Sequence, residues 1–357
     1  MLISDDTFEP GARNIPSALL PGGDLSSAVF FDIETTGLSW RTSHLYLIGA
    51  AWMDGSVWHI RQWFLQKPSE EPELLDQFSD FLKGFSRLIH YNGQTFDLPY
   101  LRHKYSFYRR SCPLDAPEST DLYRLLHPFR KLFSLSSLKQ KDVERLLAFP
   151  RQDRMDGGEL IGCYREYLQT GSEELYRLML LHNHDDVLGM VSLLPLLACP
   201  ALFRGHFAAA DARQAGDELQ LLLLPELPLP LPLRAENELC SLAAEGNHAC
   251  ITVPGVRETM KHFFPDYKNY FYLPLEDTAV HKSIGIYVDA EHRQKAKADT
   301  CYQKTEGLFF PQPAVRFQPD FYREYRQAPS FFRIENSWPG NELELKNYAC
   351  DLLQRLL

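Results

Sequence analysis

The chain has 357 residues, ordinary apolar and charged fractions, and a formal net charge of −10 at pH 7. This length can bury a sizeable core and predicts one large or two moderate domains, whereas the negative charge excludes a protein coated with basic residues for non-specific nucleic-acid binding. The seven cysteines form no Cys-x-x-Cys pair, so neither a disulfide framework nor a zinc site is indicated and a cytoplasmic location is expected. The N-terminus lacks the basic and apolar parts of a signal peptide, and no run approaches roughly 18 apolar residues, so we expect no membrane span.

The first 27 residues contain several prolines and a Gly-Gly pair and predict an irregular leader, residues 1–27. An apolar run that ends in two acids follows, and it predicts a strand over 28–34 that is buried on both faces. Residues two apart in a strand point to the same face, so Asp32 and Glu34 are expected side by side. Neighbouring carboxylates repel each other unless a cation or proton lies between them, so the pair is half of a candidate hard-cation site. The competing interpretation is a strand end with two exposed acids.

The next segments predict the rest of an α/β domain. Apolar runs at 45–52 and 57–64, separated by an Asp-Gly turn, predict an antiparallel hairpin. Helical spacing of apolar residues predicts a helix over 70–84, and a short apolar run predicts a fourth strand over 87–91. Further helices are expected over three later segments: 96–108, 136–147 and 157–168.

Two of the expected helices carry further acids. Asp97 lies in the first turn of the helix over 96–108, where the helix dipole favours a carboxylate. A longer helix is expected over 172–197, and its apolar stripe is interrupted by His182 and Asp186, which are four residues apart and share a face. The carboxylates together form an oxygen-rich ligand set of the kind that Mg²⁺ or Mn²⁺ prefers: Asp32, Glu34, Asp97 and Asp186.

From Arg102 to Arg154 the charge balance turns basic, with twelve Lys or Arg against six Asp or Glu, and aromatic residues are interleaved. A positive groove with stacking platforms is one way in which proteins hold single nucleic-acid strands. Solvated helix faces with ordinary core aromatics would give the same composition. Both interpretations stay open from the sequence.

Beyond residue 200 the amino-acid composition of the chain changes. Residues 201–234 are expected to form an alanine-rich helix followed by a Leu/Pro-rich linker or edge segment, because alternating prolines cannot lie in a central strand. Residues 235–357 are expected to form a small α+β accessory domain whose function the sequence does not indicate. Its expected elements are a hairpin around Glu245-Gly246-Asn247 and helices near 257–264, 278–290 and 342–357.

Three stretches resemble the motifs of the DEDD-type 3′–5′ exonucleases in the DnaQ-like group of the ribonuclease-H-like superfamily: Asp32–Leu38, Asn92–Pro99 and His182–Val187. The resemblance is strongest to a bacterial branch, the YprB-type predicted exonucleases, and covers about residues 25–200. It implies a mixed five-stranded sheet flanked by helices over 28–200, a small α+β C-terminal module, and hydrolysis at the 3′ end of single-stranded DNA or RNA with two divalent cations, Mg²⁺ or Mn²⁺. The implied catalytic residues are the four carboxylates and His182.

The third motif departs from both known subclasses, because His182 stands at the spacing that the tyrosine subclass uses before Asp186. A histidine with an ordinary pKa of about 6.5 can accept or orient a water proton near neutral pH. Asp185 is then expected beside the site. The residues expected to contact substrate are Thr35, Gly37, Leu38, Asn92, Gln94 and Phe96.

Alternatives remain at several points. The chain could be a nucleic-acid-binding module that keeps the fold without turnover, an endonuclease that uses the same site, or an interaction scaffold. Asn92 could be only a turn residue, and Asp121 is expected to be a helix N-cap.

Overall fold

The computed structural model describes residues 1–8, 25–155, 157–334, 338 and 340–357. The chain divides into two compact units, Met1–Pro200 and Ala201–Leu357, and each is described by itself.

Unit 1 is built on a six-stranded mixed sheet in the order β1-β4-β3-β2-β5-β6. β1, β4, β3 and β2 pair antiparallel in that order, while β5 and β6 continue parallel to β2. The strands are β1 (Leu2–Phe8), β2 (Ala28–Thr35), β3 (Leu45–Asp54), β4 (Val57–Phe64), β5 (Arg87–His90) and β6 (Glu118–Asp121).

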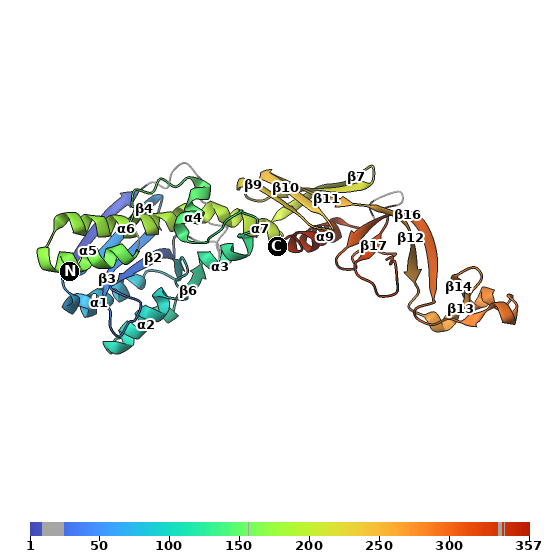
Figure 1. Cartoon of the computed structure of the whole chain (residues 1–357), viewed down its shortest axis with the longest axis horizontal. Helices are drawn as coiled ribbons and strands as arrows, with labels where there is room; N and C mark the ends of the chain where they lie inside the picture. The colour runs from blue at the N-terminus through green and yellow to red at the C-terminus, as the bar shows by residue number, and fades with distance from the viewer. Residues whose placement is uncertain (9–24, 156, 335–337, 339) are drawn as a thin grey trace. The chain divides into compact units, whose positions relative to one another are not determined.

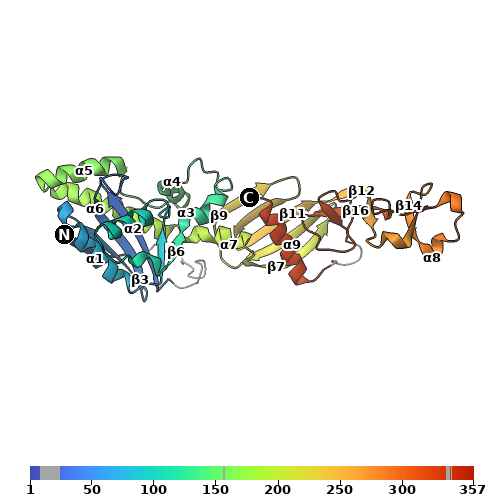
Figure 2. The ribbon, with the colours of Figure 1, turned by 90° about the horizontal axis from the view of Figure 1, so that it is seen from below.

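Helices cover both faces of this sheet (Figures 1 and 2). On one face, the apolar stripes of α1 (Glu71–Leu82) and α2 (Asp97–Phe107) bury residues such as Phe78 and Leu101 against Phe31 of β2. On the other face, α5 (Gly157–Thr170) and α6 (Glu173–Ser192) pack Tyr164 and Met179 against the sheet. Three shorter helices complete the connections: α3 (Leu122–Leu126), α4 (Gln140–Glu144) and α7 (Ala198–Phe203).

The prediction of an α/β fold with a mixed sheet is confirmed, but two details were wrong. The sheet has six strands where five were expected. The sixth is β1, which the start of the expected irregular leader forms along the edge of β4. Four consecutive polar residues, 4–7, hide the strand alternation there, and one of them, Asp5, binds Arg61 of β4 with an Nε–Oδ1 distance of 2.5 Å. The remainder of that leader, residues 9–24, lies outside the described residues.

The segment Glu173–Phe203 is long and apolar enough to cross a membrane by length and composition alone, with a mean hydropathy of 1.9 in its most apolar window. However, 78% of that window is buried inside the protein, as in a core helix, so it is weak support for a span.

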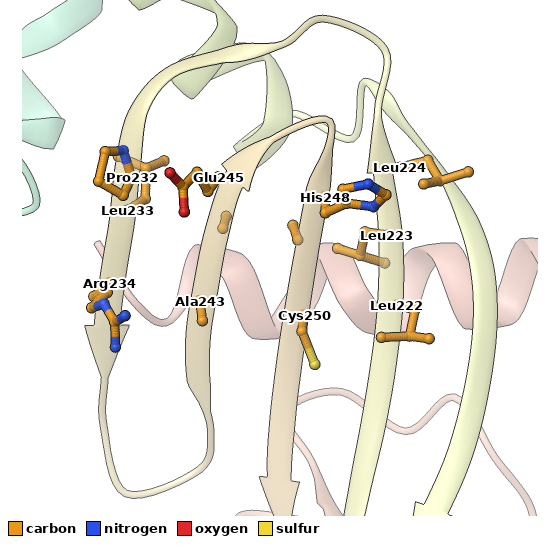
Figure 3. A pocket seen from close by; sticks show the side chains of 12 residues that line it. Leu222, Leu223, Leu224, Pro232, Leu233, Arg234, Ala243, Glu245, His248 and Cys250 are labelled. Carbon is orange, nitrogen blue, oxygen red and sulfur yellow. The ribbon is translucent and has the colours of Figure 1, made fainter.

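Unit 2 is rich in strands. Its largest sheet has the order β7-β8-β11-β10-β9, and helix α9 (Glu342–Gln354) lies behind it in Figure 3 and buries Tyr348 and Leu352. Two three-stranded sheets follow, in the orders β12-β16-β17 and β14-β13-β15.

The bounds of the remaining elements are β7 (Phe207–Ala215), β8 (Glu218–Pro225), β9 (Leu229–Glu236), β10 (Ser241–Gly246), β11 (His248–Pro254), β12 (Val256–Phe263), β13 (Tyr270–Leu273), β14 (Thr278–His281), α8 (Lys282–Gly285), β15 (Gln294–Lys295), β16 (Tyr302–Gln312) and β17 (Ser330–Phe332).

Several predictions for this region were wrong. The expected helix and linker over 201–234 are mostly the strands β7, β8 and β9, and Gly216 with a φ of 64° makes the β7–β8 turn that ends the alanine-rich run. The prolines are accommodated because β9 is an edge strand. The expected helix near 257–264 is β12, paired along its whole length with β16, and that over 278–290 is mainly β14 and the short α8. The hairpin and the final helix are confirmed.

Candidate active site

The site begins at the carboxyl end of the parallel strands β2 and β5. Pairing between them runs from Ala28 to Phe30 on β2, so Asp32 and Glu34 lie just beyond the paired part. The chain that leaves β5 at the same edge enters α2, whose first residue is Asp97. The topology therefore brings three acids from two distant segments to one place.

Helix α6 packs closely against β3, the strand that pairs with β2 beside Asp32. A Cβ on Gly49, which pairs with Asp32 in the sheet, would lie 2.0 Å from Oδ1 of Asn183, so only glycine permits this approach. Asn183 donates from Nδ2 to Oδ2 of Asp32 at 3.0 Å, and Gln62 donates to Oδ1 of Asn183 at 2.8 Å. This chain of hydrogen bonds fixes the Asp32 carboxylate against the helix that carries His182.

The acids strongly perturb one another. Burial, together with the charges of Asp186, Asp97 and Glu34, raises the pKa of Asp32 well above its usual range despite the bond from Asn183. Burial raises the pKa of Glu34 to about 8, although His182 opposes the shift. Burial likewise raises the pKa of Asp97 to about 7, against the hydrogen bonds from the backbone N–H groups of Asp97 and Ile33. Carboxylates held together in this way favour a bound cation.

A possible metal-ligand group consists of Glu34, His182 and Asp186, whose ligand atoms all lie within 4.8 Å of one another. Nε2 of His182 lies 3.6 Å from Oε1 of Glu34 and 3.2 Å from Oδ2 of Asp186. Asp32 lines the same cleft as His182 and Asp186. These oxygen and imidazole donors fit a divalent cation such as Mg²⁺ or Mn²⁺.

A loop that sequence reasoning missed completes the site. Asp185, expected only as a neighbour, accepts hydrogen bonds at Oδ2 from the backbone N–H groups of Gln152 and Asp153, both at 2.7 Å. This anchors the loop on α6 and brings the Arg151 guanidinium onto Oδ1 of Asp186. Arg151 also binds both oxygens of Glu144, at 3.1 and 3.0 Å. The positively charged side chain of Arg151 therefore contacts Asp186, which is one of the candidate metal ligands.

The same loop brings a carboxylate to His182. Oδ2 of Asp153 lies 2.8 Å from Nδ1 of His182, and Lys141 binds the same oxygen at 3.0 Å. Burial lowers the pKa of His182, but the hydrogen bond and charge of Asp186, with the charges of Glu34 and Asp153, outweigh it and raise the pKa overall. No periodicity marks this loop, and its only sequence signal was the basic composition of the segment.

The six residues expected to contact substrate do not all line the cleft that holds the acids. Asn92 lines a cleft of about 910 Å³ together with Asp32, His182 and Asp186. Its φ of 59° marks a turn, and its backbone N–H donates to Oδ1 of Asp121 at 2.8 Å. Asp121 also accepts from the backbone N–H of Tyr123 as an N-cap, as predicted.

The other five are not among the residues that line this cleft. Thr35 is buried and donates to the backbone oxygen of Gly37 at 2.9 Å, whereas Leu38 is 87% exposed. Gln94 is partly buried, and Phe96 packs on Tyr100 with a ring-centroid distance of 5.5 Å.

Comparisons with known proteins agree with this architecture. A family model described as the ribonuclease H superfamily matches residues 29–198. The uncharacterized protein YprB of Bacillus subtilis (strain 168) is 27% identical over 193 residues, which cover 52% of this chain and 45% of YprB. The chain thus spans about half the length of this curated relative.

Two solved structures are similar at low TM-scores. A family B DNA polymerase of the archaeon Pyrobaculum calidifontis has a TM-score of 0.40 and 12% identity, over 68% of this chain and 35% of the polymerase. The apo form of a nuclease has a TM-score of 0.33 and 17% identity, over 51% and 76% of the two chains.

Proposed function

Residues 29–198 of this chain belong to the ribonuclease H superfamily and are related to YprB, and on that premise we propose that the chain is a metal-dependent 3′–5′ exonuclease that hydrolyses single-stranded DNA or RNA. The observation that carries the proposal is the convergence of acids from β2, α2 and α6. Asp32 has its pKa raised by burial and by the charges of Asp186 and Asp97, which lie far from it in the sequence. Buried carboxylates that repel one another at one place are typical of a site that binds a cation.

The proposed ligands follow from the geometry. Glu34 and Asp186 would hold a divalent cation, with Asp32 and Asp97 beside them to complete the oxygen-rich site. When bound, divalent cations supply Lewis acidity that favours a nucleophilic water and stabilises the leaving oxygen of a phosphodiester.

The role proposed for His182 is to take and hold a proton. Its Nε2 faces Glu34 and Asp186, where the attacking water would lie, and its Nδ1 faces Asp153. The three carboxylates stabilise the imidazolium that forms, because each lies within 3.6 Å of a ring nitrogen. Asn183 holds Asp32 in place during this step through the hydrogen bond at Oδ2.

The test uses the purified full chain with oligonucleotides labelled at the 5′ end, as single-stranded DNA, single-stranded RNA and duplex DNA, each with Mg²⁺, Mn²⁺ or EDTA. We expect stepwise shortening from the 3′ end and release of mononucleotides only with a metal. An Asp97→Asn variant, which keeps the shape and removes the charge, is the matched control for a contaminating nuclease. No release from DNA or RNA with either metal would overturn the proposal and leave a binding module.

Substrates with a blocked 3′ end and circular single strands separate the exonuclease from an endonuclease. We expect both to resist cleavage. Cuts within a circle would assign the same acidic site to endonucleolytic chemistry.

A further inference from the structure

The cleft of unit 1 is lined by groups of opposite charge. Asp32, His182 and Asp186, which belong to the candidate cation site, form part of the lining. Most of the remaining lining residues fall within residues 123–145, including Arg130 and Lys139. This segment lies outside the three motifs that define the candidate active site.

Arg130 is held rigidly without losing its charge. Its Nε donates to the backbone oxygen of Leu135 at 3.2 Å, and its Nη2 donates to the backbone oxygen of Ser136. Carbonyl oxygens neutralise no charge, and the remaining N–H groups of the planar guanidinium are available to an anion. Arg130 is also exposed.

Lys139 is held close to the acidic cluster by its neighbour in the sequence. The next residue, Gln140, donates from Nε2 to the backbone oxygen of Asp186 at 2.7 Å. On the other side, the hydroxyl of Tyr91 donates to the backbone oxygen of Leu138 at 2.7 Å. The backbone of Lys139 is therefore fixed between the end of β5 and α6, while its side chain is exposed.

These two cations differ from their neighbours in the same lining. Lys141 is paired with Asp153, and Arg145 is paired with Asp142. Among the residues that the structure describes, no carboxylate forms an ion pair with Arg130 or Lys139. Cations that no carboxylate neutralises attract an anionic ligand to the cleft.

Aromatic rings line the same cleft as these cations. The ring of Tyr123 lies 5.9 Å from that of Tyr91 and 5.6 Å from that of His127, and all three residues line the cleft. Rings beside unpaired cations are the combination that binds unpaired bases and their phosphates without sequence preference. A duplex keeps its base faces stacked within the helix and cannot use such rings.

We propose that Arg130 and Lys139 bind consecutive phosphates of a single nucleic-acid strand whose bases stack on Tyr123, so that the strand runs from the acidic cluster along residues 123–139. The ligand class rests on the proposed nuclease function. The binding itself needs no catalysis, and DNA and RNA share the phosphate and base-face chemistry on which it depends.

The test measures binding of fluorescein-labelled single-stranded DNA, single-stranded RNA and duplex DNA to the full chain in EDTA, over a range of salt concentrations. The variants are Arg130→Gln/Lys139→Gln, Tyr123→Leu, and Lys131→Gln as a matched control, because Lys131 is exposed but does not line the cleft. Circular dichroism and thermal unfolding establish that each variant is folded.

For the double variant we expect the slope of log K against log[salt] to be shallower by about 1.4, because each lost phosphate contact on a single strand contributes about 0.7. Tyr123→Leu is expected to weaken single-strand binding at least about five-fold at unchanged salt slope. Lys131→Gln is expected to behave like the wild type, and the duplex to bind less tightly than either single strand.

An unchanged slope in the folded double variant, an equal loss in Lys131→Gln, or no binding of single strands by the wild type would overturn this inference. If the wild type cleaves strands while the double variant binds them normally, this inference alone fails. If single strands bind as expected but are never cleaved with Mg²⁺ or Mn²⁺, the proposed function alone fails.

Discussion

Two buried acidic regions of unit 1 differ in how their charge is satisfied. Glu71 on α1 has a fully buried side chain and accepts hydrogen bonds from the backbone N–H of Leu45 at 2.8 Å and the hydroxyl of Tyr108 at 2.7 Å. Lys104 neutralises it, with Nζ 2.9 Å from Oε1. In the cluster of Asp32, Glu34 and Asp97, by contrast, burial and like charges raise each pKa.

If the proposed function holds, this difference separates a structural acid from a cluster of acids that binds a cation. Glu71 has the donors and the cation that a buried carboxylate needs, all supplied by the chain itself. The cluster has too few donors for its charge, so its missing partner must come from outside. Substitutions should therefore affect folding at Glu71 and chemistry at the cluster.

The largest effect is expected for Asp97→Ala. Nuclease activity should fall by roughly a thousand-fold, because a carboxylate of the proposed cation site is lost. In EDTA, the free energy of unfolding should change by less than about 1 kcal/mol, because removing one carboxylate relieves repulsion among the others. Activity assays and urea unfolding measure the two quantities, and marked unfolding of this variant would contradict the assignment.

Glu71→Ala should produce the converse pattern. Removing the partner of Lys104 leaves a buried ammonium group unpaired, and breaking such a pair costs about 3–5 kcal/mol of stability. Urea unfolding of the wild type and variant measures the loss. The double variant Glu71→Ala/Lys104→Met should recover part of it, and a loss below about 1 kcal/mol would show that the two regions do not differ as described.

His182→Ala should lower kcat by about a hundred-fold, which is the usual contribution of a general base. His182→Tyr should keep part of the activity, because a phenol at the same spacing can still orient a water. Single-turnover kinetics at saturating metal compare the two variants. Unchanged turnover in His182→Ala would remove this side chain from the mechanism.

Arg151→Gln should tighten Mn²⁺ binding by about ten-fold, because it removes a competing positive charge from Asp186. Calorimetry without nucleic acid measures the affinity directly. Arg145→Gln is the matched control, since Arg145 pairs with Asp142 and not with a ligand of the site. Unchanged or weaker Mn²⁺ binding in Arg151→Gln would show that the guanidinium does not compete for this carboxylate.

The smallest effect concerns His90, which is buried beside Asp121 and donates to or accepts from Ser119 at 2.8 Å. Burial lowers its pKa to about 4, although Asp121 opposes the shift. The unfolded chain, with a pKa near 6.5, binds a proton first as the pH falls, so this contribution to stability is complete above pH 6.5 and is lost towards pH 4. Between pH 6.5 and 5.5 the loss should be about 1 kcal/mol.

Urea unfolding across this pH range measures the loss. In His90→Gln the stability should be lower at pH 7 but should decline less between pH 6.5 and 5.5. An equal decline in wild type and variant would assign the acid sensitivity to other groups.

Local pattern was sufficient for part of the candidate site. The two-residue period of a strand placed Asp32 and Glu34 on the face that meets α6, and the spacing of four placed His182 and Asp186 on one face of a helix. The same reasoning failed for residues 201–234 and 257–264, where the alanine-rich run and β12 take their conformation from the strands that they pair with.

The sequence by itself determined the order of the acidic motifs, the α/β pattern of the first 200 residues and the faces on which the acids lie, because these depend on periods of two and about 3.6 residues. Only the tertiary structure decided that Asp185 holds a loop, that Arg151 reaches Asp186, and that Arg130 and Lys139 remain unpaired in the cleft. Those contacts join segments without a common period, and their energies depend on which donors and charges the complete fold brings within reach of each carboxylate.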